Sequence, residues 1–242
     1  MMTMTTSIIP AAANAPMLKY FESQGFNELY IDKDSVENQL LGGDTNRVLA
    51  LSDYAHYLQC MRNATSAHLL ADTSFGGDDA ANWADTADQL VRCGANTILI
   101  SDYQSKTSNH QPNLLLDEDF EAKIRTMKAE LTDTNTDAMV NLGGFSTYGI
   151  DGLKKRIQIA RSENIAKISI SNVAAKDLSI IGAIMKPNQE IGLAIDNPKM
   201  TFGSAQQVNP AFVLDTYHPK KATQQWVQKA GPSVVLRLYM GN

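Results

Sequence analysis

The sequence predicts a single (β/α)8 barrel spanning residues 1–242. Short apolar segments rich in β-branched residues alternate with amphipathic segments, which is typical of parallel βαβ units. About eight such units follow one another, as a closed barrel requires, and no linker or low-complexity segment interrupts them. An open doubly wound sheet is the alternative, but it usually has fewer strands, and no G-x-G-x-x-G pattern follows the first strand.

A recurring phrase places four of the strands. An amphipathic helix is followed by a glycine or asparagine and then by a β-branched strand that ends in polar residues. The small residue suits a left-handed helix cap that turns the chain back towards the sheet. The phrase reads YFESQGFNELYID at 20–32, QLVRCGANTILISD at 89–102, IARSENIAKISISN at 159–172 and VQKAGPSVVLRLY at 227–239.

Four further apolar segments complete the predicted barrel. The eight strands are expected at residues 8–12, 28–32, 67–72, 97–102, 137–142, 166–171, 191–196 and 233–239. Helical patterns separate them, and in the segment 117–131 one face carries Phe120, Ile124, Met127 and Leu131. The chain is thus expected to end on its eighth strand, with no helix to follow.

Composition and charge exclude several classes of protein. The net charge is −5 and no basic cluster exceeds Leu-Lys-Lys-Arg at 153–156, so a nucleic-acid partner is not expected. No apolar run approaches the ~18–20 residues that span a bilayer. Cys60 and Cys93 have no metal or redox spacing, which indicates a reducing compartment. The first residues lack the basic region of a signal peptide, so a cytoplasmic protein is expected.

Polar residues follow the predicted strands at the ends where barrel enzymes carry their chemistry. Three or four carboxylates that converge on one barrel mouth would suit a hard cation such as Mg²⁺. Helix capping or solvent exposure is the alternative for each acid taken alone. The residues at these strand ends are Asn14, Asp32 with Lys33, Asp72 with Ser74, Asp102, Asn141, Ser171 with Asn172, Asp196 and Arg237.

A long polar segment at 101–119 follows the fourth predicted strand. Its Lys106, Thr107, Ser108 and Asn109 combine a cation with hydroxyl and amide groups, which suits a loop that closes over an anionic substrate. A solvated loop is the alternative. His68 begins the third predicted strand and is therefore expected at the opposite end of the barrel.

Six segments resemble the phosphoenolpyruvate mutase/isocitrate lyase superfamily in order and spacing. They are MLKYFESQGFNELYI at 17–31, LLGGDT at 40–45, NATSAHLLADTSFGG at 63–77, CGANTILISD at 93–102, KTSN at 106–109 and GIDGLKKRIQIA at 149–160. The resemblance implies a (β/α)8 barrel that binds Mg²⁺ and a small 2-oxo acid or phosphonate, and that makes or breaks a C–C or P–C bond. The loop KTSNH lacks the cysteine of the lyases and is closer to the mutases and phosphonopyruvate hydrolases.

The resemblance also assigns a metal-binding turn, from which this chain departs. Asp72 matches the first carboxylate of the turn and Ser74 the second; a shifted match puts Asp72 on the second and Leu70 on the first. In either alignment one carboxylate is absent. Asp102 stands beside Ser101, which replaces the glutamate after strand four. The metal ligands implied in this way are Asp72, Ser74 and Asp102.

The substrate-binding positions depart further from the family pattern. Asp32 and Lys33 replace a Ser-Gly that closes around the substrate carboxylate, Asn141 replaces an arginine, and Ser171 replaces a histidine. The catalytic candidates are accordingly Asp32, Lys33, Lys106 and Asn141. The substrate-binding candidates are Asp44, Thr107, Ser108, Asn109, Ser171 and Arg237.

Two functional interpretations remain open at this point. In the first, the barrel is a repurposed enzyme in which Asp72, Asp102 and Asp32 hold a cation and a lysine replaces the absent arginine. In the second, it is a non-catalytic barrel that serves as a binding or assembly subunit. The retained loop lysine and strand-end acids favour the enzyme. Family members are commonly tetramers that exchange a C-terminal helix, so a homo-oligomer is implied, although the chain is expected to end before that helix.

Overall fold

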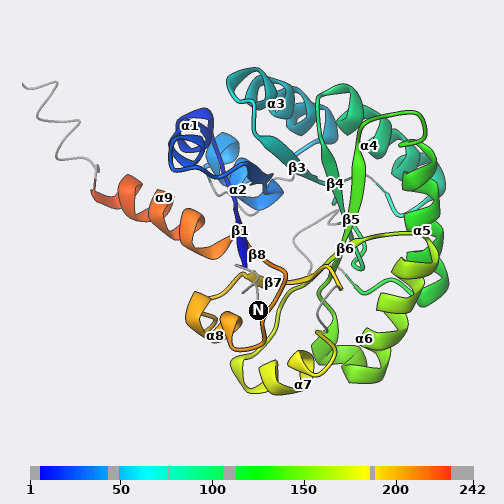
Figure 1. The fold of residues 1–242 in the computed structure, drawn as a ribbon. Helices are drawn as coiled ribbons and strands as arrows, with labels where there is room; N and C mark the ends of the chain where they lie inside the picture. The colour runs from blue at the N-terminus through cyan, green and yellow to red at the C-terminus, as the bar shows by residue number, and fades with distance from the viewer. Residues whose placement is uncertain (1–5, 43–48, 76, 106–112, 186–188, 230–242) are drawn as a thin grey trace, which may run out of the picture.

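Eight parallel strands in the computed structural model form a nearly closed barrel surrounded by helices (Figure 1). The structure describes residues 6–42, 49–75, 77–105, 113–185 and 189–229. The strands are β1 (Ser7–Pro10), β2 (Glu28–Ile31), β3 (His68–Asp72), β4 (Thr97–Ser101), β5 (Asp137–Leu142), β6 (Lys167–Ile170), β7 (Ile191–Ile195) and β8 (Phe212–Asp215).

The helices alternate with these strands along the chain. They are α1 (Ala15–Ser23), α2 (Lys33–Leu41), α3 (Leu51–Ala64), α4 (Ala80–Arg92), α5 (Asp117–Ala129), α6 (Phe145–Ser162), α7 (Leu178–Gly182), α8 (Phe202–Gln206) and α9 (Tyr217–Lys229), with a 3₁₀ turn at Ala175–Asp177. Figure 1 shows α1 to α8 arranged around the barrel, whereas α9 runs away from it.

Strand order establishes that the sheet is a barrel and not a doubly wound sheet. The strands pair in the order β1-β8-β7-β6-β5-β4-β3-β2, and all pairs are parallel. The two end strands meet at an isolated bridge between Ala11 and Tyr30, where the Ala12 amide donates to the Tyr30 carbonyl at 2.8 Å. This bridge brings the sheet back to its first strand, so the predicted (β/α)8 architecture is confirmed.

Seven of the eight predicted strands coincide with observed strands, but the eighth prediction is wrong. The eighth barrel strand is Phe212–Asp215, which pairs with both β1 and β7. Residues 233–239, predicted to fill this place, lie outside the described residues. The expectation that no helix follows the last strand is also wrong, because α9 follows β8.

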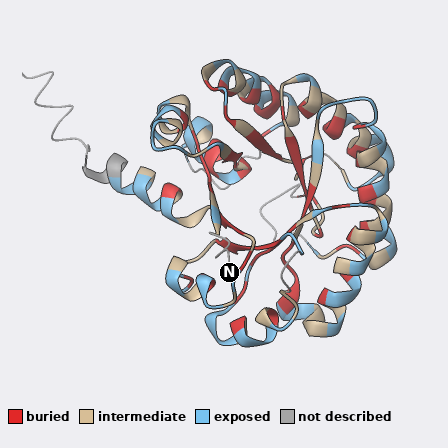
Figure 2. Cartoon of the chain, in the orientation of Figure 1, coloured by how far each residue is buried: buried red, intermediate tan, exposed pale blue. Residues whose placement is uncertain are grey.

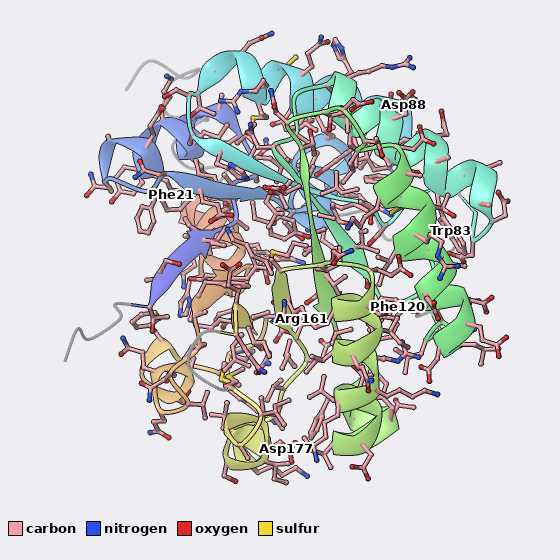
Figure 3. All side chains as sticks on the ribbon, turned by 45° about the vertical axis from the view of Figure 1, so that its right-hand side comes forward. Phe21, Trp83, Asp88, Phe120, Arg161 and Asp177 are labelled. Carbon is pink, nitrogen blue, oxygen red and sulfur yellow. The ribbon has the colours of Figure 1, made fainter. Side chains whose placement is uncertain are left out.

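Alternation along the strands divides the core into two parts. Every second side chain along a strand faces the barrel interior, where a small cluster includes Tyr30, Leu70, Leu99 and Met139. The intervening residues face the helices and form the larger cluster, in which Trp83 of α4 and Phe120 of α5 are buried (Figure 3). Figure 2 shows the resulting pattern, with buried strands inside and the exposed faces of the helices outside.

A polar layer lies at the N-terminal end of the barrel interior. Lys167 of β6 donates to Glu28 of β2 at 2.8 Å, across the barrel, and His68 contacts the Thr97 hydroxyl at 2.7 Å. Burial lowers the pKa of His68, so the imidazole is neutral near neutral pH. His68 thus lies at the end of the barrel where the sequence places it.

Gly192 of β7 provides a test of interior packing. A Cβ atom at this position would overlap the ring of Phe212 on the neighbouring strand. We expect Gly192→Ala to lower the free energy of unfolding by about 1–3 kcal/mol, because overpacking forces the ring or the backbone to move. Gly203→Ala is the matched control, since a Cβ there meets only Thr201 Oγ1 at 4.0 Å. Chemical denaturation of both variants checks this, and equal stabilities would contradict it.

Candidate functional site

Two carboxylates, Asp32 and Asp72, lie at the end of the barrel where the strands finish, here called the barrel mouth. Asp32 directly follows β2 and caps α2, accepting from the Ser35 amide at 2.9 Å. Asp72 is the last residue of β3. Burial, together with the negative charges of Asp34 and Asp72, raises the pKa of the Asp32 carboxyl to about 6. The negative field of Asp72 therefore extends to Asp32, as expected for acids at one barrel mouth.

Tyrosine hydroxyls and backbone amides fix the orientation of Asp72. Its Oδ2 accepts from the Tyr30 hydroxyl at 2.7 Å, and its Oδ1 accepts from the Ser74 amide at 2.8 Å. Its own amide donates to the Tyr54 hydroxyl at 2.9 Å. Burial, together with the charge of Asp72, raises the pKa of both phenols, so Tyr30 and Tyr54 remain protonated donors. Asp72 is thus an ionisable group held in one position.

Lys33 stabilises the turn that follows Asp72. The side chain is 3% exposed, and its Nζ donates to the Ser74 carbonyl and lies 4.5 Å from the centre of the Phe75 ring. The Thr73 hydroxyl donates to the Leu99 carbonyl at 2.8 Å, which ties the same turn to β4. Lys33 therefore positions Ser74 and the turn, and it is directed towards them in this structure.

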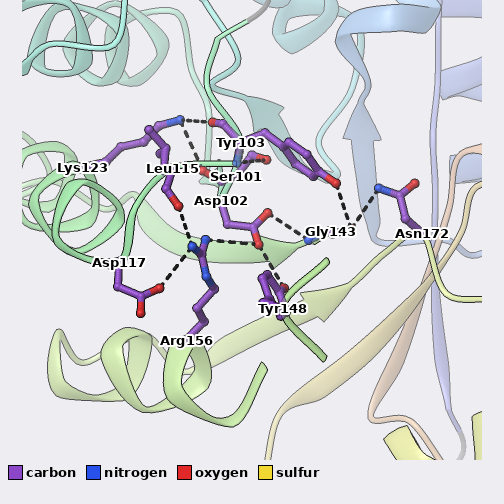
Figure 4. A network of polar contacts seen from close by, with 10 residues as sticks. All are labelled: Ser101, Asp102, Tyr103, Leu115, Asp117, Lys123, Gly143, Tyr148, Arg156 and Asn172. Carbon is purple, nitrogen blue, oxygen red and sulfur yellow. Dashed lines mark hydrogen bonds and ion pairs between the residues drawn. The ribbon is translucent and has the colours of Figure 1, made fainter. Parts of the chain in front are cut away.

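Asp102 belongs to a buried network on the outer side of β4 (Figure 4). Its side chain is 0% exposed and accepts from the Gly143 amide at 2.9 Å and the Tyr148 hydroxyl at 3.0 Å. Arg156 Nη1 of α6 lies 3.5 Å from its Oδ2. Burial raises the pKa of the Asp102 carboxyl, while these donors and the guanidinium lower it. Service as a metal ligand, as predicted, would require Asp102 to leave this ion pair.

The structure also shows buried cations that the sequence reasoning missed. Lys123 of α5 is fully buried and donates to the carbonyls of Ser101 at 3.3 Å and Tyr103 at 3.1 Å (Figure 4). Burial lowers the pKa of its ammonium to about 8. Arg156, also missed, binds Asp117 at 3.1 Å as well as Asp102. The sequence did carry a signal for the burial of Lys123: it lies three residues after Phe120, on the apolar face of the segment 117–131.

The segment after β4 leaves and returns through a paired stem. Tyr103 and Leu114 form an antiparallel bridge, and the Gln104 amide donates to the Asn113 carbonyl at 2.8 Å. The Leu115 amide then donates to the Asp102 carbonyl at 2.9 Å. Lys106, Thr107, Ser108 and Asn109, predicted to contact substrate, come between Gln104 and Asn113 in the sequence and lie outside the described residues. Asp44 and Arg237 also lie outside them.

Asn141 and Ser171 lie at the same mouth, on β5 and directly after β6. Asn141 is the penultimate residue of β5 and is half-buried. Ser171 is 7% exposed, and its Oγ lies near Gly143. The next residue, Asn172, has a left-handed backbone with φ of 56°, and its backbone N–H donates to Asp196 Oδ2 at 2.6 Å. Asp32, Asp72, Asp102, Asn141 and Ser171 therefore all lie at one end of the barrel, although Asp102 faces outwards.

A cavity of about 600 Å³ opens on the flank of the mouth between α1, α2 and α9. Ser35, which donates to Asp32, contributes to its lining, as do Met17, Asn38 and Thr223. Its size is within the range of small-molecule sites. The cavity thus provides space beside the Asp32 cap.

Comparison with known proteins gives matches to solved structures. No protein-family model matches the sequence, and no curated protein sequence matches it. Oxaloacetate acetylhydrolase in complex with 3,3-difluorooxalacetate superimposes with a TM-score of 0.80 at 16% identity, over 98% of this chain and 82% of that one. Phosphoenolpyruvate phosphomutase from Streptomyces platensis subsp. rosaceus gives 0.78 at 15%, over 98% and 84%. Phosphonopyruvate hydrolase with oxalate and Mg²⁺ gives 0.78 at 18%, over 99% and 84%.

These similarities define a class of barrel. A further neighbour, 2,3-dimethylmalate lyase, is described as a member of the PEP mutase/isocitrate lyase superfamily, with a TM-score of 0.74 at 15% identity over 96% of this chain and 89% of that one. The chain has the fold of these enzymes, so the resemblance predicted from its sequence is confirmed at the level of the fold. Within the described residues, no helix is long and apolar enough to cross a membrane.

Replacement of Arg156 tests the buried network. We expect Arg156→Met to lower the free energy of unfolding by about 3–5 kcal/mol, because it leaves the Asp102 carboxylate buried without its counterion. Arg125→Met is the matched control, since Arg125 pairs with Glu121 and Glu163 at the surface and should contribute no more than about 1 kcal/mol. Urea denaturation measures both, and a similar loss in the two variants would refute the special role of Arg156.

Replacement of Asp32 tests its raised pKa. Because the folded state holds the proton more tightly than the unfolded state, the stability of the wild type should fall as the pH rises from about 4 to about 6. Asparagine caps helices as well as aspartate does but carries no charge. We therefore expect Asp32→Asn to be more stable than the wild type by about 2–3 kcal/mol at pH 8 and equal to it near pH 4.

Asp79 provides the control of opposite sign for this experiment. It caps α4, but hydrogen bonds from Asn82 lower the pKa of its carboxyl. Asp79→Asn should therefore bring no gain at pH 8. Thermal unfolding across pH 4–8 with a chelator present measures both variants. If the difference in stability between Asp32→Asn and the wild type did not change with pH, burial would not raise the pKa of the Asp32 carboxyl.

Proposed function

We propose that the barrel mouth binds a small 2-oxo acid or phosphonate together with a divalent cation, and that the protein is an enzyme of C–C or P–C bond chemistry. The observation that carries this proposal is the fixed orientation of Asp72 at the same barrel mouth as a second carboxylate, Asp32. The folds compared above support it, because one was solved with oxalate and Mg²⁺ and another with 3,3-difluorooxalacetate.

The donor set fits a cation that needs few protein ligands. Each oxygen of Asp72 accepts one hydrogen bond and retains a second acceptor site. Asp32 and Asp72 repel each other, and a cation would remove that repulsion. Mg²⁺ is commonly held by one or two carboxylates with waters and substrate, so it does not need the cluster of three acids or histidines that is absent from the described residues.

The described residues have distinct tasks in this proposal. Asp72 and Asp32 would hold the cation, with the Ser74 hydroxyl as a further ligand, and Lys33 would keep the turn in place. When bound, Mg²⁺ would polarise the oxo group of a chelating 2-oxo acid. Asp102 would instead support the mouth from behind through Arg156.

The charge of the substrate requires a partner in a mouth that carries several acids. Lys33, Lys106 and Arg237 are the cations proposed for this task, of which the structure describes Lys33. Asn141 would hydrogen-bond the substrate without neutralising it. Asp44, Thr107, Ser108, Asn109 and Ser171 remain proposed substrate contacts.

A second candidate function is that of a non-catalytic barrel, which serves as a binding or assembly subunit. Burial of Asp102 against Arg156 favours it, because this acid is engaged in a structural pair and is not available at the mouth.

Thermal unfolding with Mg²⁺ and oxalate separates the two candidates. We expect the pair to stabilise the wild type by about 2.7 kcal/mol when the ligand is present at 100 times its Kd. Asp72→Asn should abolish the effect. Asp137→Asn should retain it, because Asp137 begins β5 and therefore lies at the end of the barrel opposite the mouth. A wild type that Mg²⁺ and oxalate leave unchanged would reject the proposed enzyme and support the non-catalytic barrel.

A further inference from the structure

Two buried polar atoms in the barrel interior lack hydrogen-bond partners among the described residues. They are Asn141 Oδ1 on β5 and Ser169 Oγ on β6. The two residues are direct neighbours in the register of these strands, and Ser169 is 0% exposed. A buried acceptor or hydroxyl without a partner is costly, and such a group in a native protein usually meets a water or a ligand.

Strand alternation shows that both side chains point into the barrel. Asn141 lies two residues after Met139, which belongs to the interior cluster. Ser169 lies two residues after Lys167, whose ammonium reaches Glu28 across the barrel. Asn141 is also one residue from the C-terminal end of its strand, so the pair lies on the side of the interior that faces the mouth.

The residues in register with this pair are uncharged. The row of residues in register runs from Ser101 through Asn141 and Ser169 to Gly192. The ring of Phe212 occupies the space where Gly192 would carry a Cβ. An aromatic ring offers Ser169 no hydrogen-bond partner of ordinary strength, and no residue of the row can neutralise an anion.

We propose that Asn141 and Ser169 form a subsite for an uncharged hydroxyl group of the substrate. This inference rests on the proposed function and narrows it to 2-oxo acids that carry a hydroxyl on the carbon next to the oxo group. The hydroxyl donates to Asn141 Oδ1 and accepts from the Ser169 hydroxyl, so both atoms gain a partner. A carboxylate or phosphonate at the same place would bring negative charge against an acceptor oxygen.

Isothermal calorimetry with Mg²⁺ and three ligands tests the subsite. Pyruvate, 3-hydroxypyruvate and phosphonopyruvate share the 2-oxo acid and differ in the group that would reach Asn141. We expect 3-hydroxypyruvate to bind about tenfold more tightly than pyruvate, and phosphonopyruvate to bind less tightly than either. The Asn141→Leu and Ser169→Ala variants should each reduce the ratio between the first two affinities towards one.

A matched variant controls for the loss of a buried polar group as such. The Thr86 hydroxyl of α4 is also buried without a partner, but Thr86 lies on a helix outside the barrel. Thr86→Val should keep the tenfold ratio, and circular dichroism should confirm that every variant is folded. Ser169→Ala removes a single oxygen, so it remains informative if Asn141→Leu does not fold.

The outcomes separate this inference from the proposal on which it rests. If none of the three ligands binds, the proposed function and the subsite are both rejected. If they bind with equal affinity, or if phosphonopyruvate binds best, the subsite assignment alone is overturned. Tightest binding of phosphonopyruvate would mean that the Asn141 side chain presents its amide nitrogen, and not its oxygen, to the ligand. A ratio that survives in Ser169→Ala and Asn141→Leu also overturns it.

Discussion

The barrel mouth depends on one buried ion pair, between Asp102 and Arg156. Removal of two charges from water costs several kcal/mol for each ion, and the further partners of both groups reduce that cost here. Asp102 accepts from Gly143 and Tyr148, while Arg156 also binds Asp117. The pair therefore joins the end of β4 to the loop after β5 and to α5 and α6.

Much of the fold could be predicted because alternation is a property of every unit of the chain. Strands buried on both faces give continuous apolar runs, and these identified seven strands. The eighth was missed because β8 follows α8, a helix of only five residues, which gives too short a periodic pattern to mark a helix–strand unit. The longer apolar run at 233–239 matched the pattern better. The run at 212–215 ends in Asp215, as β3 ends in Asp72, and this shared ending was the usable signal.

The candidate site could be predicted in its position but not in its orientation. The sequence places Asp32, Asp72, Asp102 and Asn141 at strand ends, and all of them lie at one end of the barrel. Whether a side chain faces the interior depends on a single residue of register. Ser101 and Asp102 illustrate this, because the interior position falls to Ser101 and the acid turns towards Arg156. The partners of buried acids, such as Arg156 and Tyr30, come from distant segments, and spacing along the chain does not identify them.

The paired stem formed by Tyr103, Gln104, Asn113 and Leu114 separates two kinds of evolutionary constraint. Its backbone hydrogen bonds and the anchored Lys123 belong to the scaffold, and they do not depend on which side chains the intervening residues carry. Substitutions and changes of length between the two sides of the stem should therefore be tolerated by the fold. Substitutions at residues 106–112 can accordingly change the chemistry of this segment while the stem keeps its backbone hydrogen bonds.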